Sequence, residues 1–365
     1  VSYGGMMKMQ GGSAVVLFIS GAAKGLTIQE LQQERRIVLD LSTTETIDMA
    51  KLLSMAREAY SRDDTATVII LLKPHRARLS PEAAVLLAGA WWRISFPGDS
   101  ALYRDALQLM AQGLSGMNPG LKRERAILAY SDMLLAAGNL EEARKYIRFL
   151  KDSPSDDIAI SARIKEMDLL NKQALFEDAF AANKRLLITF PEAIIPAGAK
   201  GPYYAALGDA YLGLNDYAKA LEEYAKAVAN DPQIFKKDLN LYARLGDAAF
   251  KIGDLEKART YMIMSINLGD PRNKTMQMLR LGDCLYKLGQ MRQAVEVYSQ
   301  VGNLPVQGEN IVIAKLRKAS ILIDNDLKDD GKLANKTFYE VLGVYDSIEI
   351  APNTPESALA PIVKI

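Results

Sequence analysis

Residues 203–232, YYAALGDAYLGLNDYAKALEEYAKAVANDP, predict two amphipathic helices joined by a short turn. Small residues stand where the two helices must touch, at Gly208 on the first helix and at Ala220 and Ala227 on the second. Pro232 closes the unit. A single hairpin of this kind cannot bury its own apolar face, so copies of it stack into a solenoid, which usually serves as a binding surface.

The same pattern returns twice downstream. Gly246 follows Gly208 by 38 residues, and Gly282 follows Gly246 by 36 residues. Ala258 and Ala294 supply the facing small residues, where a larger side chain would overpack the helices at a cost of about 1–3 kcal/mol. The first interval indicates a linker that is about four residues longer than a 34-residue unit requires.

The turn between the two helices carries its own signal. Gly253 and Gly289 stand at this point in two copies, where a glycine can take the left-handed conformation that ends a helix. Asn215 occupies the place in the copy at 203–232, and asparagine also tolerates that backbone. We therefore expect left-handed residues at all three positions.

This pattern resembles the tetratricopeptide repeat family, whose unit is a 34-residue helix-turn-helix. The copy at 203–232 carries the family's residues at Leu207, Gly208, Tyr211, Ala220, Tyr224, Ala227 and Pro232. Weaker copies extend in both directions, with Ala56, Ser131 and Met167 in the place of the packing glycine. Degenerate copies at the ends are expected, because terminal repeats cap the stack.

The resemblance implies a mainly α fold, a TPR-type α-α superhelix of about eight helical hairpins over residues 46–346. A small β segment is expected over residues 1–43 and a C-terminal tail over residues 347–365. Length alone would favour two or three domains, but in a repeat array each unit contacts its neighbours only.

The N-terminal segment differs from the repeats. SAVVLFIS and the alternating apolar positions of residues 26–41 predict two or three strands. Together with the strand before it, the run Arg36–Leu41 resembles the C-terminal half of an AMIN-type module, a small β-sandwich of bacterial cell-envelope proteins, although the first half is missing. An alternative is a signal peptide, with MMKMQGG as its charged region and SAVVLFISGAA as its apolar region. Both interpretations point to export.

The bulk composition excludes several classes of protein. The net charge is +1, from 45 basic and 44 acidic residues, so the surface as a whole does not attract nucleic acid. No apolar run approaches the ~18 residues that a membrane-spanning helix needs. His75 and Cys284 are the single histidine and the single cysteine, and neither belongs to a catalytic motif. We therefore expect that the protein is not an enzyme and that it binds no cofactor and no metal ion. The acidic pairs Glu141–Glu142 and Glu222–Glu223 are expected where helices begin or on solvated faces.

The resemblance also implies a candidate site. In this family, positions 2, 5, 9, 12 and 13 of the first helix line the concave groove. Position 9 is aspartate in five successive copies, positions 12 and 13 add aromatic rings and lysines, and together they are Asp132, Asp168, Asp209, Asp247, Asp283, Phe250, Tyr286, Lys172, Lys251 and Lys287. Such a surface would suit an extended partner with Lys, Arg or backbone N–H groups. The alternative is that each aspartate pairs with a lysine of the next repeat or is simply solvated.

The sequence thus predicts a non-enzymatic protein–protein interaction scaffold of a bacterial cell envelope, located in the periplasm, that binds a partner protein or peptide in the concave groove. Peptidoglycan or envelope machinery would bind through the N-terminal β segment, whose exposed edge also permits self-association. The alternative is a cytoplasmic adaptor or co-chaperone. The carboxylate clamp that some family members use has Asn at position 9 with Lys at positions 5 and 13, whereas this chain has Asp at position 9 and Leu or Ala at position 5.

Overall fold

The computed structural model describes residues 2–9, 12–18, 23–31, 36–43, 48–95, 100–304, 308–330, 339 and 341–343. The chain divides into two compact units, Val1–Pro74 and His75–Ile365. This division groups the hairpin at residues 49–72 with the strands, whereas the sequence pattern groups it with the repeats. The predicted tail at 347–365 lies outside the described residues.

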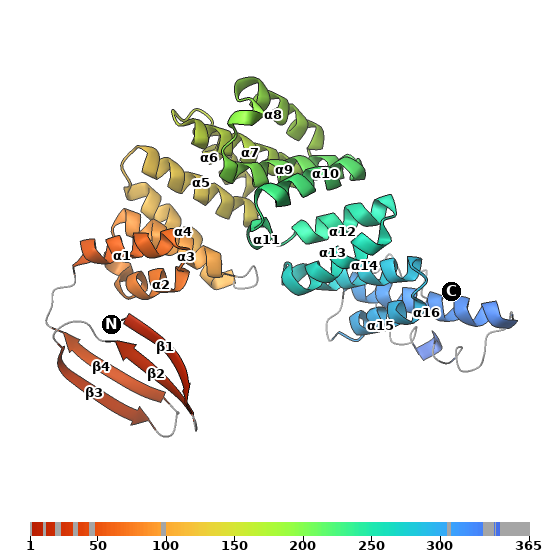
Figure 1. Cartoon of the computed structure of the whole chain (residues 1–365), viewed down its shortest axis with the longest axis horizontal. Coiled ribbons are helices and arrows are strands. Elements are labelled where there is room, and N and C mark those ends of the chain that lie inside the picture. Colours follow the sequence, from red (N-terminus) through yellow and green to blue (C-terminus); the bar gives the residue numbers. More distant parts are fainter. Residues whose placement is uncertain are drawn as a thin grey trace. The chain divides into compact units, whose positions relative to one another are not determined.

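The first unit contains two antiparallel strand pairs and one helical hairpin (Figure 1). Strand β1 (Ser2–Met9) pairs with β2 (Gly12–Phe18), and β3 (Ala23–Leu31) pairs with β4 (Arg36–Thr43). The resemblance to an AMIN-type module stays a prediction. Helices α1 (Met49–Ser61) and α2 (Thr65–Leu72) form the hairpin, and Ala56 at its packing position is fully buried.

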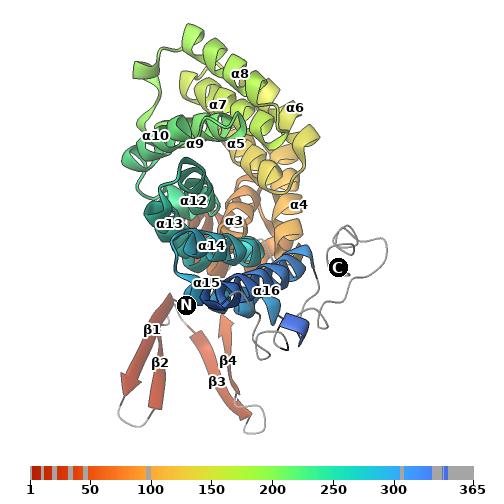
Figure 2. The ribbon, with the colours of Figure 1, turned by 90° about the vertical axis from the view of Figure 1, so that its right-hand side faces the viewer.

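The second unit begins within the 3-10 helix η1 (Lys73–Arg78) and is a stack of helical hairpins (Figure 2). Each hairpin packs on the next, so the core runs along the stack as a series of apolar clusters. The paired helices are α3 (Pro81–Ile94) with α4 (Ser100–Gly116), α5 (Leu121–Ala136) with α6 (Leu140–Leu150), α7 (Asp156–Lys172) with α8 (Phe176–Thr189), α9 (Ala197–Gly213) with α10 (Tyr217–Asn230), α12 (Leu241–Ile252) with α13 (Leu255–Leu268), and α14 (Lys274–Lys287) with α15 (Met291–Gly302). Helix α16 (Glu309–Asp330) packs on α15.

The turns between paired helices confirm the sequence prediction. Gly253 and Gly289 have φ of 86° and 74°, and Asn215 has φ of 63°. Ala174 takes the same left-handed place between α7 and α8, with φ of 57°, which costs a residue with a Cβ about 1–2 kcal/mol.

Short helices fill the connections between hairpins. The 3-10 helices η2 (Glu192–Ile194) and η3 (Pro271–Asn273) precede α9 and α14. The longer linker predicted before Gly246 forms the one-turn helix α11 (Ile234–Lys237), anchored by the buried side chain of Ile234. Phe235 of α11 stacks on Tyr242 of α12, with ring centroids 3.8 Å apart. The extra residues are therefore packed against the hairpins on either side.

Candidate binding surface

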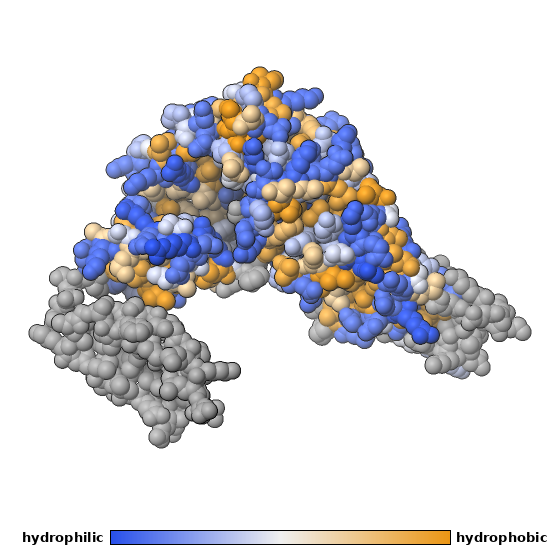
Figure 3. Space-filling view, in the orientation of Figure 1, coloured by the Kyte–Doolittle hydropathy of each residue, from blue (hydrophilic) through white to orange (hydrophobic). Residues whose placement is uncertain are grey.

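The first helices of five successive hairpins, α5, α7, α9, α12 and α14, follow one another along the stack (Figure 2). Their side chains at family positions 9 and 12, together with the lysines at position 13, define a surface that we call the first-helix face. Its members are Asp132, Asp168, Asp209, Asp247, Asp283, Leu135, Asn171, Leu212, Phe250, Tyr286, Lys172, Lys251 and Lys287. In the orientation of Figure 1, the molecular surface is hollowed between α5 and α11 (Figure 3).

Four of the five aspartates form ion pairs with the next first helix in the stack. Lys165, Arg244, Arg280 and Arg317 supply the cations for Asp132, Asp209, Asp247 and Asp283 respectively. This is the alternative that the sequence left open, with arginine in place of lysine at three of the four positions. The sequence reasoning missed these cations, although Lys165, Arg244 and Arg280 each stand three residues before the aspartate of their own helix.

Asp209 lies at the centre of the most extensive network. The hydroxyl of Tyr224 donates to Asp209 Oδ1 over 2.6 Å, and Arg244 Nε lies 2.7 Å from the same oxygen. Arg244 also donates through both of its terminal nitrogens to Asp238, in the segment after α11. One guanidinium therefore joins the carboxylates of two segments, so the network fixes α12 against α9 and against the linker between them.

Burial controls the ionisation of this network. Loss of solvent raises the pKa of Asp209 to about 6, and the nearby Asp238 and Asp168 carboxylates act in the same direction. The positive charge of Arg244 and the hydrogen bond from Tyr224 oppose that rise. The Asp209 and Asp238 carboxylates in turn help to hold the pKa of Arg244 above its ordinary value, so the guanidinium stays charged.

Asp168 is the exception in the series. The residue that stands three before Asp209 on the next first helix is Ala206, which carries no charge. Asp168 Oδ1 instead lies 3.7 Å from Nζ of Lys172, one turn along its own helix. Loss of solvent is the largest cause that raises the pKa of Asp168, and Lys172, Arg244 and Lys165 only partly oppose it.

Of the other predicted site residues, Phe250 and Lys251 lie on α12, Tyr286 and Lys287 on α14, and Lys172 on α7. Position 12 is buried at Leu135 but half-buried at Phe250, and Tyr286 is 39% exposed. The ammonium of Lys287 lies 4.3 Å from the centre of the Phe250 ring, which is a cation–π contact between α14 and α12. Lys251 is exposed at the end of α12. The structure therefore brings Phe250 and Lys287 together, while Lys172 stands with Asp168.

Cys284 and Glu223, which the sequence did not assign to a site, are both buried. Cys284 is fully buried, its Sγ lies 3.1 Å from the carbonyl oxygen of Leu255, and burial raises the pKa of its thiol. The prediction that Glu223 lies at a helix start or on a solvated face is wrong, because Glu223 lies within α10 and is only 8% exposed. Its Oε1 accepts a hydrogen bond from Nζ of Lys226 over 2.7 Å. Among the described residues, no three His, Cys, Asp or Glu side chains cluster as metal ligands would.

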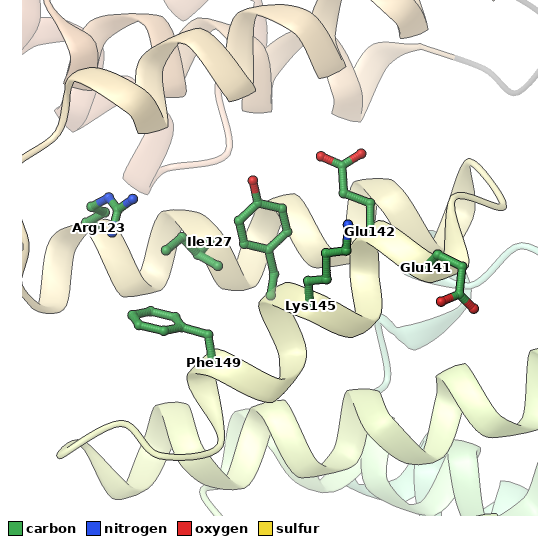
Figure 4. A pocket seen from close by; sticks show the side chains of 7 residues that line it. Arg123, Ile127, Glu141, Glu142, Lys145 and Phe149 are labelled. Carbon is green, nitrogen blue, oxygen red and sulfur yellow. The ribbon is translucent and has the colours of Figure 1, made fainter.

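A second concave feature lies on the hairpin of α5 and α6 (Figure 4). It has a volume of about 690 Å³ and is lined by Arg123, Ile127, Glu141, Glu142, Lys145, Tyr146 and Phe149. Figure 4 shows Ile127 and Phe149 side by side at one end with Arg123, and Glu142 at the other end. Two carboxylates and two cations line it, so its charge does not select a ligand of either sign. No sequence motif pointed to this pocket.

Three stretches of the chain match models of the tetratricopeptide repeat, at residues 201–234, 239–268 and 278–304. They coincide with the hairpins α9–α10, α12–α13 and α14–α15. The second unit therefore contains tetratricopeptide repeats, which suggest a protein–protein interaction scaffold. In the described part of the chain, no helix combines the length and the apolar character that crossing a membrane requires.

Solved structures with a similar fold include tetratricopeptide repeat proteins. The hetero-tetramer Cut9–Hcn1 of the APC/C gives a TM-score of 0.50 at 19% identity, covering 86% of this chain and 55% of that chain. A STAND-type signal transduction ATPase with a tetratricopeptide repeat sensor, from Pyrococcus horikoshii, gives a TM-score of 0.54 at 16% identity, covering 86% and 48%. This chain thus spans about half the length of each. At these identities the likeness concerns the fold alone. No curated protein matches the chain.

Proposed function

We propose that this tetratricopeptide-repeat chain is a non-enzymatic scaffold that holds an extended segment of a partner protein on its first-helix face. The observation that carries the proposal is the apolar and aromatic character of this face at α12 and α14, where Phe250, Lys287 and Tyr286 stand on neighbouring repeats. Aromatic rings on rigid helices supply large contact area at little cost in conformational entropy, and residues of this kind dominate the affinity of protein interfaces.

In this proposal, four of the five aspartates do not contact the partner segment but hold neighbouring repeats together. Asp132, Asp209, Asp247 and Asp283 already hold a cation of the next first helix. They align neighbouring repeats, so that the side chains at positions 12 and 13 are presented at a regular spacing. The partner segment would then bind chiefly through Phe250, Tyr286 and the lysines at 251 and 287.

The test is site-specific photo-crosslinking in the native cell. A benzoylphenylalanine at position 286 should capture a partner protein, and the same probe at Ile188, which is 84% exposed on the second helix α8, serves as the matched control. The captured segment is then synthesised and titrated against the purified chain. We expect Tyr286→Ala to weaken its binding at least about tenfold, as removal of an aromatic anchor does, and Ile188→Ala to leave it unchanged. Equal effects of the two substitutions would refute the proposed face.

For the location, we propose the bacterial cell envelope, with the N-terminal β segment fixing the scaffold there. The support is the resemblance of residues 36–41 and the preceding strand to an AMIN-type module. Peptidoglycan or envelope machinery is the corresponding ligand of that segment. Cell fractionation is the test, and a protein found only in the cytosol would favour the alternative, a cytoplasmic adaptor that uses the same first-helix face.

A further inference from the structure

We propose that the gap in the ion-pair series at Asp168 is a subsite for a guanidinium or ammonium side chain of the bound partner segment. The inference rests on the proposed function and deepens it, because it names the chemistry that the partner must carry. It starts from a regularity that the other four first helices establish. On each of them, the position 9 aspartate receives a cation from the next first helix.

The place of the missing cation is identified by the repeat itself. Arg244 and Arg280 stand three residues before Asp247 and Asp283, and Ala206 stands three residues before Asp209. Ala206 ends at a methyl group and is 4% exposed, so it offers no charge to the preceding carboxylate. Asp168 therefore receives no cation from the next first helix, whereas the other four aspartates each bind one.

A second polar side chain of α7, that of Asn171, reaches α9 at Ala206. Asn171, one turn further along α7, donates its Nδ2 to the carbonyl oxygen of Ala206 over 2.7 Å. This bond directs Asn171 across the same gap between α7 and α9, and its Oδ1 is buried without a hydrogen-bond partner. A carboxylate at Asp168 and an unmatched amide oxygen one turn further along α7 suit a donor with several N–H groups, such as a guanidinium.

The charge balance around Asp168 favours an added cation. Lys172 is an exposed partner at 3.7 Å on the same helix, and exposed pairs at this spacing contribute only a few tenths of a kcal/mol. Arg244 is already shared between Asp209 and Asp238, and Lys165 holds Asp132. The side chain of Asp168 is 36% exposed, so the carboxylate remains accessible to a ligand. Partial burial and the nearby Asp238 hold the pKa of Asp168 above its ordinary value, and a bound cation would oppose both effects by stabilising the charged carboxylate.

The experiment uses the full chain and two uncharged-end pentapeptides, acetyl-Ala-Ala-Arg-Ala-Ala-amide and its counterpart with citrulline in place of arginine. Citrulline keeps the shape of arginine and removes its charge. Binding is followed by NMR titration of the backbone amides at low salt. We expect the arginine peptide to shift the amides of residues 165–172 and 205–209, and to bind at least about tenfold more tightly than the citrulline peptide, as a charge-assisted hydrogen bond implies.

Three variants complete the test. Asp168→Asn keeps the shape and should weaken the arginine peptide at least about tenfold, and Ala206→Arg should abolish its binding by supplying the missing cation from within. Asp157→Asn removes an exposed carboxylate from the same helix and should change nothing. Because Ala206 is buried, circular dichroism must show that the arginine variant is folded, and Asp168→Asn decides the question if it is not.

The outcomes separate this inference from the proposed function. Equal binding of the two peptides, no binding of the arginine peptide, or an Asp168→Asn variant that binds within twofold of the wild type would overturn the subsite. The proposed function would survive each of these results as long as Tyr286→Ala still weakens the captured partner segment. If Tyr286→Ala has no effect while Asp168→Asn does, the subsite stands and the aromatic part of the face does not.

Discussion

The ring of Tyr224 lies where a side chain at Gly208 would stand. A Cβ built on Gly208 would come within 2.6 Å of Tyr224 Cδ1, and one on Gly282 would come within 2.5 Å of Tyr298 Cε1. Both tyrosines then reach past the glycine and donate their hydroxyl to the neighbouring aspartate, Asp209 or Asp283. The packing glycine is thus required by the tyrosine of the second helix as well as by close helix contact.

Gly208→Ala should destabilise the chain by about 1–3 kcal/mol relative to Gly246→Ala. Both substitutions gain the same helix propensity, but a Cβ at Gly246 meets the flexible Met262 side chain at 3.1 Å instead of a buried ring. Urea unfolding of the two variants measures the difference. Equal midpoints would contradict the role assigned to the tyrosine ring.

Ala174→Gly should stabilise the chain by about 1 kcal/mol, because Ala174 holds a left-handed conformation that disfavours a Cβ. Gly253→Ala is the matched reverse change. A Cβ at Gly253 would meet nothing within 4 Å, so its cost is conformational alone and of the same size. Thermal unfolding midpoints should move in opposite directions, and a shift of both in one direction would refute the argument.

Arg244→Met should cost about 3 kcal/mol, because it leaves the Asp209 and Asp238 carboxylates without their shared cation in a partly buried network. Lys165→Met should cost less than about 1 kcal/mol, since its partner Asp132 is 54% exposed and water can replace the lysine. The free energy of urea unfolding of each variant tests this ranking. If Lys165→Met lost as much free energy of unfolding as Arg244→Met, exposure would not determine how much these ion pairs contribute to stability.

Asp209 should make stability fall as the pH rises from about 4 to about 6. Its folded pKa, about 6, is higher than the ordinary value of 3.8, so the folded chain binds a proton in this window that the unfolded chain has released. Burial is the largest cause of this raised pKa; Asp238 and Asp168 raise it further, and Arg244 and Tyr224 lower it.

The variant Asp209→Asn isolates this contribution, because asparagine keeps the shape and does not titrate. The wild type should lose stability relative to the variant between pH 4.5 and pH 7.5, by about 2 kcal/mol. Urea midpoints at the two pH values measure it. If the wild type instead becomes more stable relative to the variant as the pH rises, the pKa of Asp209 is lowered on folding. The charge of Arg244 would then have a larger effect on that pKa than burial has.

Local signals predicted the repeat units well. The spacing of Gly208, Gly246 and Gly282 located three hairpins, and Asn215, Gly253 and Gly289 marked turns that the structure confirms. These features depend on residues a few positions apart, so helix periodicity and backbone sterics decide them. Ala174 escaped notice because alanine carries no turn signal, and it is held in its conformation by the hairpin around it.

The sequence by itself determined that this chain builds stacked helical hairpins with a regular row of aspartates along the first helices. Only the tertiary structure decided what those aspartates do. Whether a carboxylate faces a partner or a neighbouring cation depends on residues more than thirty positions away, which approach only when one repeat packs on the next. That packing gave four of the aspartates a cation from the next first helix and left Asp168 with Lys172 of its own helix, because Ala206 stands where α12 and α14 carry an arginine.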